Sequence, residues 1–216
     1  MPKSDTRTIA LTFDNGPDAE VTPFVLDVLA RHDVKATFFV VGNKLAAARS
    51  ASERAHEEGH WSGNHTWSHS SPFRERGDAA FVAAEIDDTQ RELGALAHPA
   101  KYFRPFGGQG RIDGALNAAA VSHLCGGGFT CIMWNCVPRD FADFDGWPAT
   151  ALAQIAAEPR PLVVLHDIRL AAMQHLDRFI GTLKDNGHSF TQTFPDSCIA
   201  IAGGRPTDIL GGIVRN

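Results

Sequence analysis

Residues 8–18 read TIALTFDNGPD, a short apolar run that ends in a polar turn. The β-branched, aliphatic and aromatic residues at 8–13 predict a strand. A second run of this kind, LVVLHD at 162–167, ends in His166 and Asp167. Such strongly apolar strands are typical of parallel sheets whose two faces are both buried, so these stretches indicate an α/β fold.

Strands alternate with helical segments along most of the chain, which favours parallel βα units. The predicted strands are 8–13, 35–41, 59–64, 101–103, 129–134 and 162–165. The predicted helices are one that begins at Thr22-Pro23, then 43–58, 78–96, 113–123, 147–158 and 170–186. Beyond Phe190 no element is assigned. The pattern leaves a barrel or a doubly wound sheet, in one domain over residues 1–216.

The composition is that of a globular protein without a basic excess. The 216 residues are 44% hydrophobic and carry a net charge of −5, so a nucleic-acid partner is not expected. The longest apolar runs have the length of strands, far below the roughly 20 residues of a membrane span. The first residues, MPKSDTR, lack the apolar core of a signal peptide, so we expect a cytoplasmic protein.

Ionisable residues cluster just after the predicted strands. They are Asp14, His65 and His69, Arg104, Asp140, and His166. In (β/α) barrels the chemistry gathers at the carboxyl ends of the strands, so this placement favours an enzyme.

Two pairs of histidines have the spacing His-x-x-x-His, which suits a metal site. The first pair, His56 and His60, also fits the zinc-protease pattern H-E-x-x-H, but Gly59 is expected to end the helix before His60. We therefore interpret the first pair as a helix end. The second pair, His65 and His69, would share one side of a helical turn and hold a divalent cation. A third ligand is then needed, for which Asp14 and Asn15 at the end of the first strand are the candidates.

Five short motifs occur in an order that resembles a known family. They are TFDNGPD at 12–18, HTWSH at 65–69, FRPFGG at 103–108, WNCVPRDF at 134–141 and VVLHD at 163–167. Together they resemble the polysaccharide deacetylases, carbohydrate esterase family four with its nodulation-type chitooligosaccharide deacetylase domain. The resemblance implies a distorted (β/α) barrel, here of about seven parallel strands. It also implies hydrolysis of acetyl groups on sugars with a bound divalent metal.

The resemblance also implies a role for each motif residue. Asp14 matches the general base, and Arg104 the arginine that holds its carboxylate. His65 and His69 match metal ligands, with Asn15 at the position of the third. His166 matches the general acid, oriented by Asp140. A backbone N–H near Phe106 and Gly107 would bind the oxyanion, and Phe141 and Trp134 would wall the substrate site. Plainer interpretations stay open: Arg104 and Asp140 in a structural ion pair, and Phe141 and Trp134 in the core.

The chain departs from the family pattern at three places. The family has Asp where this chain has Asn15, so the ligand set loses a negative charge that Asp18 could replace. In the third motif, Arg104 to Gly108, either the usual second proline is replaced or one residue is missing, so the aromatic wall of the groove is displaced or missing. In the fourth motif Val137 replaces an Asp and Phe141 replaces a Trp.

The leading hypothesis is a metal-dependent hydrolase that removes N-acetyl groups from an aminosugar or an oligosaccharide or polysaccharide. Zinc is the expected metal, with cobalt or nickel as alternatives. One alternative function is hydrolysis of another C–N bond, in a cyclic ureide, an imide or a formyl-aminosugar. Another is a catalytically weak glycan-binding protein, favoured by Asn15. The sequence leaves the oligomeric state open.

Overall fold

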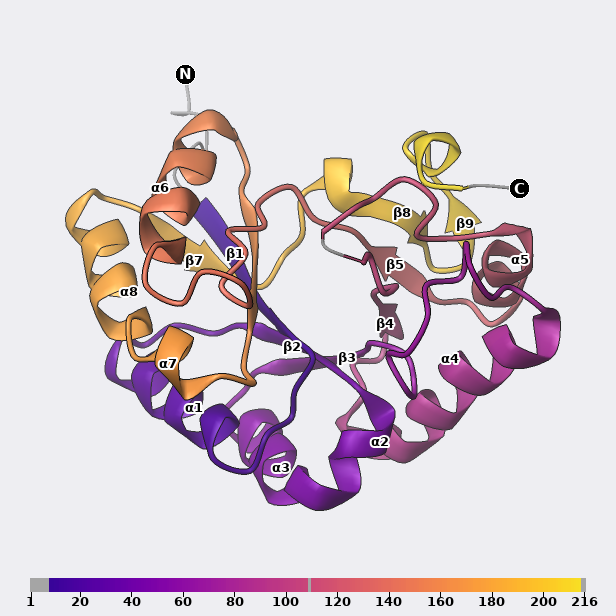
Figure 1. Ribbon diagram of the computed structural model, residues 1–216, viewed down its shortest axis with the longest axis horizontal. Helices are drawn as coiled ribbons and strands as arrows, with labels where there is room; N and C mark the ends of the chain where they lie inside the picture. The colour runs from indigo at the N-terminus through magenta and orange to yellow at the C-terminus, as the bar shows by residue number, and fades with distance from the viewer. Residues whose placement is uncertain (1–7, 109, 215–216) are drawn as a thin grey trace.

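The computed structural model describes residues 8–108 and 110–214, which form one curled sheet surrounded by helices (Figure 1). The strands lie in the order β6-β1-β2-β3-β4-β5-β8-β9, and β7 also pairs with β1. They are β1 (Thr8–Asp14), β2 (Thr37–Val40), β3 (Trp61–Asn64), β4 (Tyr102–Phe103), β5 (Thr130–Ile132), β6 (Leu162–His166), β7 (Ser189–Thr191), β8 (Ile199–Ala202) and β9 (Arg205–Pro206). Strands β1 to β7 all pair in parallel, so the predicted α/β barrel-like fold is confirmed.

The curled sheet is joined across its opening by the chain that follows β5. The amide of Cys136 donates to the carbonyl of Leu162, and its carbonyl accepts from the amide of Val164. These bonds form a parallel bridge between Cys136 and β6. The loops that follow β5 and β6 are therefore held close together at one end of the sheet.

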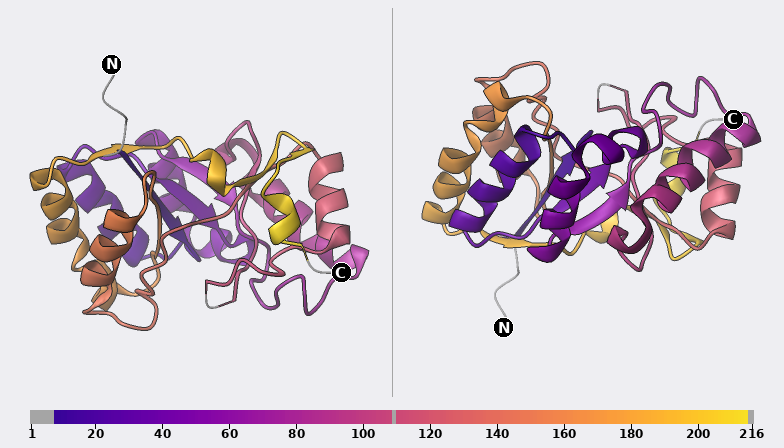
Figure 2. Two further views of the ribbon diagram at one scale, coloured as in Figure 1. Left: turned by 90° about the horizontal axis from the view of Figure 1, so that it is seen from above. Right: turned by 90° about the horizontal axis from the view of Figure 1, so that it is seen from below.

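Helices cover the outer face of the sheet, and the view from below shows those of the first half side by side (Figures 1 and 2). They are α1 (Val21–Arg31), α2 (Gly42–Leu45), α3 (Arg49–Glu57), α4 (Ala79–Leu93), α5 (Ala118–Gly126), α6 (Trp147–Ala157), α7 (Leu170–Met173) and α8 (Leu176–Asp185). Short 3-10 turns add η1 (Ala46–Ala48), η2 (Gly94–Leu96), η3 (Asp196–Cys198) and η4 (Leu210–Gly212). In the described part of the chain, none of these helices has the length and apolarity needed to cross a membrane.

Several helix boundaries differ from the prediction. The helix predicted over 43–58 is divided into α2, η1 and α3, and that over 170–186 into α7 and α8. The helix predicted from residue 113 begins at Ala118, because the side chain of Asn117 accepts a hydrogen bond from the amide of Ala120 and caps it there. The first helix begins at Val21, one residue before the predicted cap Thr22.

The segment after Phe190, unassigned from the sequence, completes the sheet. Strand β7 pairs with the first residues of β1, and β8 and β9 form an antiparallel extension beyond β5. These strands have only two to four residues, too few to show a period.

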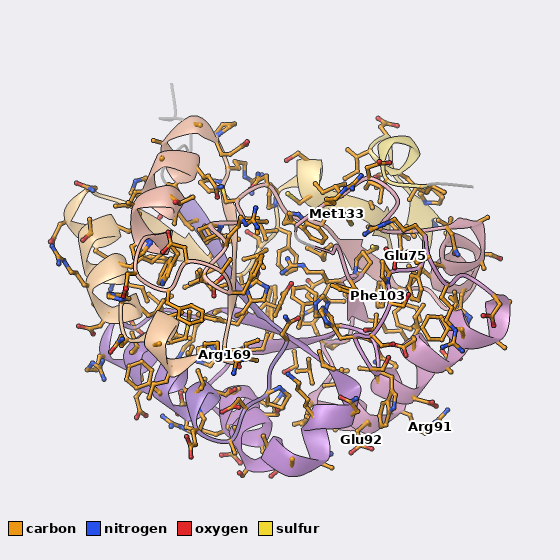
Figure 3. All side chains as sticks on the ribbon, viewed as in Figure 1. Glu75, Arg91, Glu92, Phe103, Met133 and Arg169 are labelled. Atoms are coloured by element: carbon orange, nitrogen blue, oxygen red, sulfur yellow. The ribbon has the colours of Figure 1, made fainter. Side chains whose placement is uncertain are left out.

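The core has two layers. One lies between the sheet and helices α1, α6 and α8, and includes Phe13, Trp147 and Phe179. The other lies around β4 and β5 and includes Phe103 and Met133, labelled in Figure 3, together with residues of helices α4 and α5. Both layers hold the carboxyl ends of the strands in fixed positions, and the polar residues follow at those ends.

Candidate active site

Strand register brings the predicted site residues together. Asp14 at the end of β1 is the direct partner of His166 at the end of β6. Asn64 at the end of β3 is the partner of Phe103 in β4, so His65 and Arg104 follow at neighbouring strand ends. Residues that are up to 152 positions apart in the sequence thus share one end of the sheet.

Asp14 and Arg104 form a buried ion pair. The Arg104 guanidinium donates to Asp14 Oδ1 at 2.7 Å and to the hydroxyl of Thr12 at 2.8 Å. It also donates to the carbonyls of Ile132 and Met133, and it lies 3.9 Å above the ring of Phe39. Arg104 is fully buried and Asp14 is 4% exposed, so the charges are held in place without water between them.

His166 and Asp140 form a second buried pair. Asp140 Oδ1 lies 2.8 Å from His166 Nδ1, and Asp140 Oδ2 accepts from the His166 amide at 2.8 Å. Burial opposes the charged form of His166, but the hydrogen bond and charge of Asp140, with the charges of Asp14 and Asp167, raise the His166 pKa above its usual value. The imidazole is therefore suited to carry a proton near neutral pH.

His65 and His69 lie against each other, with ring centroids 4.7 Å apart. The predicted helical turn between them is wrong, because no helix occurs at 65–69 and the backbones of Thr66 and His69 have φ values of 68° and 49°. The Asn64 side chain accepts from the amide of Thr66, and the Thr66 hydroxyl accepts from the amide of His69. A side-chain-supported loop thus brings the two rings together.

Both imidazoles are neutral and suited to bind a metal. Burial lowers the pKa of His65 to about 3 and, with the nearby His65, that of His69 to about 3. His65 Nδ1 donates to the carbonyl of Arg104 at 2.8 Å. The free lone pair of His65 is therefore on Nε2, which lies 3.7 Å from Asp14 Oδ2.

Asn15 has an unsatisfied side-chain oxygen at the same site. Its Oδ1 atom is buried and has no hydrogen-bond partner, although a buried polar atom normally has one. The described residues contain no group of three His, Cys, Asp or Glu side chains placed to hold a metal ion. An amide oxygen beside two imidazoles can complete such a set, so the residues present fit a divalent cation.

Asp18 does not supply the missing charge in the pocket. Its Oδ1 atom accepts hydrogen bonds from the amides of Glu20 and Val21, at the start of α1. The Asp18 amide donates to the hydroxyl of Thr22, which ties the loop after β1 to the same helix. Asp18 therefore does not replace the negative charge that is lost with Asn15 at the third ligand position.

One pocket of about 220 Å³ joins these groups. Of the predicted site residues, nine line it: Asp14, Asn15, His65, His69, Phe106, Gly107, Trp134, Phe141 and His166. The other two, Arg104 and Asp140, lie behind Asp14 and His166 and hold them. The amides of Phe106 and Gly107 donate to none of the described residues, so they are free to bind an oxyanion.

The comparison with known proteins decides the family. Residues 2–123 match the model of the family described as polysaccharide deacetylase. A chitooligosaccharide deacetylase of Rhizobium leguminosarum bv. trifolii is 35% identical over 172 residues, which cover 76% of this chain and 73% of the relative. The chain belongs to the polysaccharide deacetylase family.

Two further relatives show how far the likeness extends. A peptidoglycan-N-acetylglucosamine deacetylase of Listeria monocytogenes is 34% identical over 195 residues, 88% of this chain but 39% of the relative. The chain therefore spans well under half the length of that polysaccharide deacetylase. The solved structure of the Bc1960 peptidoglycan N-acetylglucosamine deacetylase has a TM-score of 0.74 and 29% identity, covering 88% of this chain and 87% of that chain.

The departures from the polysaccharide deacetylase pattern lie in the pocket wall. The ring of Phe106 lies 4.0 Å from that of His69, so this aromatic residue still faces the site. Phe141 stands edge-on to His166 at 5.0 Å. Val137 also lines the pocket, where it adds an apolar surface. The Trp134 indole, almost fully buried, donates to the carbonyl of Gly110 and packs against Gly107.

Three polar residues that support the site were not predicted from the sequence. Asn64 donates to the carbonyl of Ile86, and Glu85 accepts from the amide and the hydroxyl of Ser68. Glu85 falls on the buried face of α4, three residues after Val82, and an acid on an apolar helix face is the signal that could have found it. Lys44 donates to the carbonyl of Asn15 at 2.8 Å.

The pattern H-E-x-x-H at 56–60 does not form a metal site. Helix α3 ends at Glu57, and Gly59 has a φ of 83°, which confirms the predicted helix end. His60 is buried edge-on against Phe38 and accepts from the amide of Ala36. His56 remains at the surface.

Proposed function

We propose that the chain is a metal-dependent hydrolase that removes N-acetyl groups from an aminosugar within an oligosaccharide or polysaccharide. One observation carries this proposal. The Asp14–Arg104 and His166–Asp140 pairs face a single pocket that also contains two neutral imidazoles and the unpartnered oxygen of Asn15. The named activities of the relatives support it.

The site residues divide the reaction between two sides of the pocket. Asp14, held by the Arg104 guanidinium, accepts a proton from the water that attacks the amide carbonyl. The free amides of Phe106 and Gly107 donate to the developing oxyanion. His166, protonated with the help of Asp140, gives its proton to the departing nitrogen as the C–N bond breaks. Water and amide thus become acetate and a free amine.

His65, His69 and Asn15 would hold the cation, for which we propose zinc, with cobalt and nickel as alternatives. A bound divalent cation would supply Lewis-acid polarisation of the carbonyl and of the attacking water. The donor set of two imidazoles and one neutral oxygen suits these metals better than magnesium or calcium, which prefer oxygen ligands.

The pocket size favours a small portion of a larger substrate. A volume of about 220 Å³ lies below the ~300–1,000 Å³ of sites that enclose a drug-sized ligand. We infer that the acetamido group and part of one sugar ring enter, while the rest of the glycan stays outside.

The test is acetate release from N-acetylglucosamine oligomers by the metal-stripped protein, with zinc or cobalt added back. Metal-dependent release supports the proposal. Release of product from a cyclic ureide, an imide or a formyl-aminosugar, with none from the oligomers, would favour the alternative C–N hydrolase. Oligomer binding without turnover would favour a glycan-binding protein, the alternative to which Asn15 points.

A further inference from the structure

The segment Val41–Lys44 contacts both loops that carry the proposed metal ligands. It lies directly after β2, between the loop at 14–18 and the loop at 65–69. On the first loop, the amide of Val41 donates to the carbonyl of Gly16 at 2.8 Å. Asn15, the residue before Gly16, is therefore held from its carboxyl side.

On the second loop, two amides of the same segment bind the backbone between the histidines. The amide of Gly42 donates to the carbonyl of Thr66, and that of Asn43 to the carbonyl of Trp67, each at 3.0 Å. A Cβ atom on Gly42 would lie 2.5 Å from both the Thr89 hydroxyl and the Trp67 ring, so the approach needs glycine. The segment thus fixes the two loops relative to each other.

Lys44 is the side chain through which this segment reaches Asn15. Its Nζ atom donates to the Asn15 carbonyl at 2.8 Å, and the Asn15 backbone has a φ of 71°, in the left-handed region. Where the side chain of Asn15 points depends on this left-handed backbone conformation. A hydrogen bond to the Asn15 carbonyl restrains the conformation and therefore the side chain.

Charged groups surround Lys44 in its half-buried position. Burial lowers the pKa of Lys44, while Asp167 and Asp18 attract its ammonium and Arg169 repels it. Arg169 lies in the loop after β6, on the same side of the molecule as the α1 and α7 helices (Figure 3). The buried Asp167 also accepts from the hydroxyl of Thr22, so it is fixed in turn.

We propose that Lys44 is a positioning residue of the metal site, which restrains Asn15 so that its amide oxygen stays among the ligands. The proposal rests on the metal site proposed above. Asn15 is the weakest of the three ligands, because a neutral amide oxygen binds zinc or cobalt less strongly than an imidazole nitrogen does. A restraint on its backbone therefore matters more here than for His65, which its own hydrogen bond to Arg104 already orients.

The experiment is a double-mutant cycle on cobalt(II) affinity, measured by isothermal titration, together with the visible spectrum of bound cobalt(II). The proteins are wild type, Lys44→Met, Asn15→Gly and the double variant. Glycine removes the amide oxygen and tolerates the left-handed backbone. Lys44→Arg keeps the donor and the charge, and Lys35→Met removes an exposed lysine near the other end of β2. The unfolding midpoint of each apo-protein checks its folding.

Lys44→Met is expected to weaken cobalt(II) binding by about 10-fold or more, within the ~10–100-fold range for residues that support metal ligands. Its spectrum should approach that of Asn15→Gly. In the Asn15→Gly background the same change should not weaken binding, because the ligand that Lys44 restrains is already gone. Lys44→Arg and Lys35→Met should bind as wild type does.

Other outcomes would overturn the inference. Removing the positive charge of Lys44 would by itself strengthen cation binding, both in wild type and in Asn15→Gly. Tighter cobalt(II) binding in both would therefore show that Lys44 acts only by its charge. An equal loss in both backgrounds would show that it does not act through Asn15. Wild-type protein that binds no cobalt(II) would contradict the metal site itself. If that protein still released acetate without added metal, the deacetylase activity would stand, and the metal site and the role of Lys44 would not.

Discussion

The two halves of the candidate site differ in how fully their polar groups are partnered. In the acid–base half, Asp14 and Arg104 meet at 2.7 Å, and Asp140 and His166 at 2.8 Å. In the metal half, Asn15 Oδ1 has no partner, and His65 Nε2 is 3.7 Å from the nearest oxygen of Asp14.

This difference separates what the fold supplies from what a ligand must supply. The acid–base half is fixed by the protein alone, so its residues contribute to both stability and catalysis. The metal half leaves the buried Oδ1 atom of Asn15 unsatisfied, at a cost of about 1–3 kcal/mol. A cation that binds there satisfies it, so changes in this half should act on ligand binding more than on the apo fold.

Asp14→Asn is expected to have the largest effect on activity. An amide cannot accept the proton of the attacking water, so kcat should fall by about 10²–10⁴-fold. The measurement is acetate release from an N-acetylated oligomer with metal added. Asp18→Asn, on the same loop, keeps the side-chain oxygen that accepts from the amides of Glu20 and Val21, and should change kcat by less than about twofold. A similar loss in both variants would mean that the loop, and not the Asp14 carboxylate, is responsible.

Arg104→Met should produce the largest loss of stability. It removes the partner of a buried carboxylate, so we expect the free energy of unfolding to fall by about 3–5 kcal/mol. Urea denaturation of the apo-protein measures this change. Arg91→Met is the control, because Arg91 points outward from α4 and its ion pair with Asp88 is exposed (Figure 3). A loss at Arg104 no larger than at Arg91 would show that the buried pair adds no stability.

Asp140→Asn should change the pH dependence of activity. Asp140 raises the pKa of His166, and the general acid acts in its protonated form, so activity is lost as pH rises through that pKa. The variant lowers this pKa, so the alkaline limb of the kcat profile should move to lower pH. Asp145→Asn, which removes the partner of the surface His175, should leave the profile unchanged. If the alkaline limb does not move in Asp140→Asn, the limb does not report the pKa of His166.

The strand-end positions of the site could be predicted from the sequence because they follow from local pattern. An apolar run marks each strand, and a polar residue such as Asp14 or His166 marks its carboxyl end. Parallel strands place those ends together, whatever the distance along the chain. The same local signals placed the helix end at Gly59, where a left-handed residue is needed.

The loop at 65–69 and the break after α2 could not be predicted, because long-range contacts decide them. The loop is shaped by Asn64 and by Glu85 on a distant helix, and not by helix propensity. The short helix α2 lies where the amides of Gly42 and Asn43 bind this loop. The bond from Lys44 to Asn15 joins residues 29 positions apart through a backbone carbonyl, which leaves no trace in side-chain pattern.

Asn15→Asp should have the smallest effect, and its sign should depend on the metal. Without a cation, the new carboxylate is an additional buried charge, and the unfolding free energy should fall by about 1–3 kcal/mol despite the nearby Lys44. With zinc, the added negative charge should tighten binding by about 10-fold, which is ~1.4 kcal/mol. Unfolding with and without zinc, together with isothermal titration, measures both changes. Equal zinc affinity in Asn15→Asp and wild type would remove Asn15 from the ligand set. An apo-protein destabilised by the carboxylate and rescued by zinc would instead show that the fold leaves this half of the site for the metal to complete.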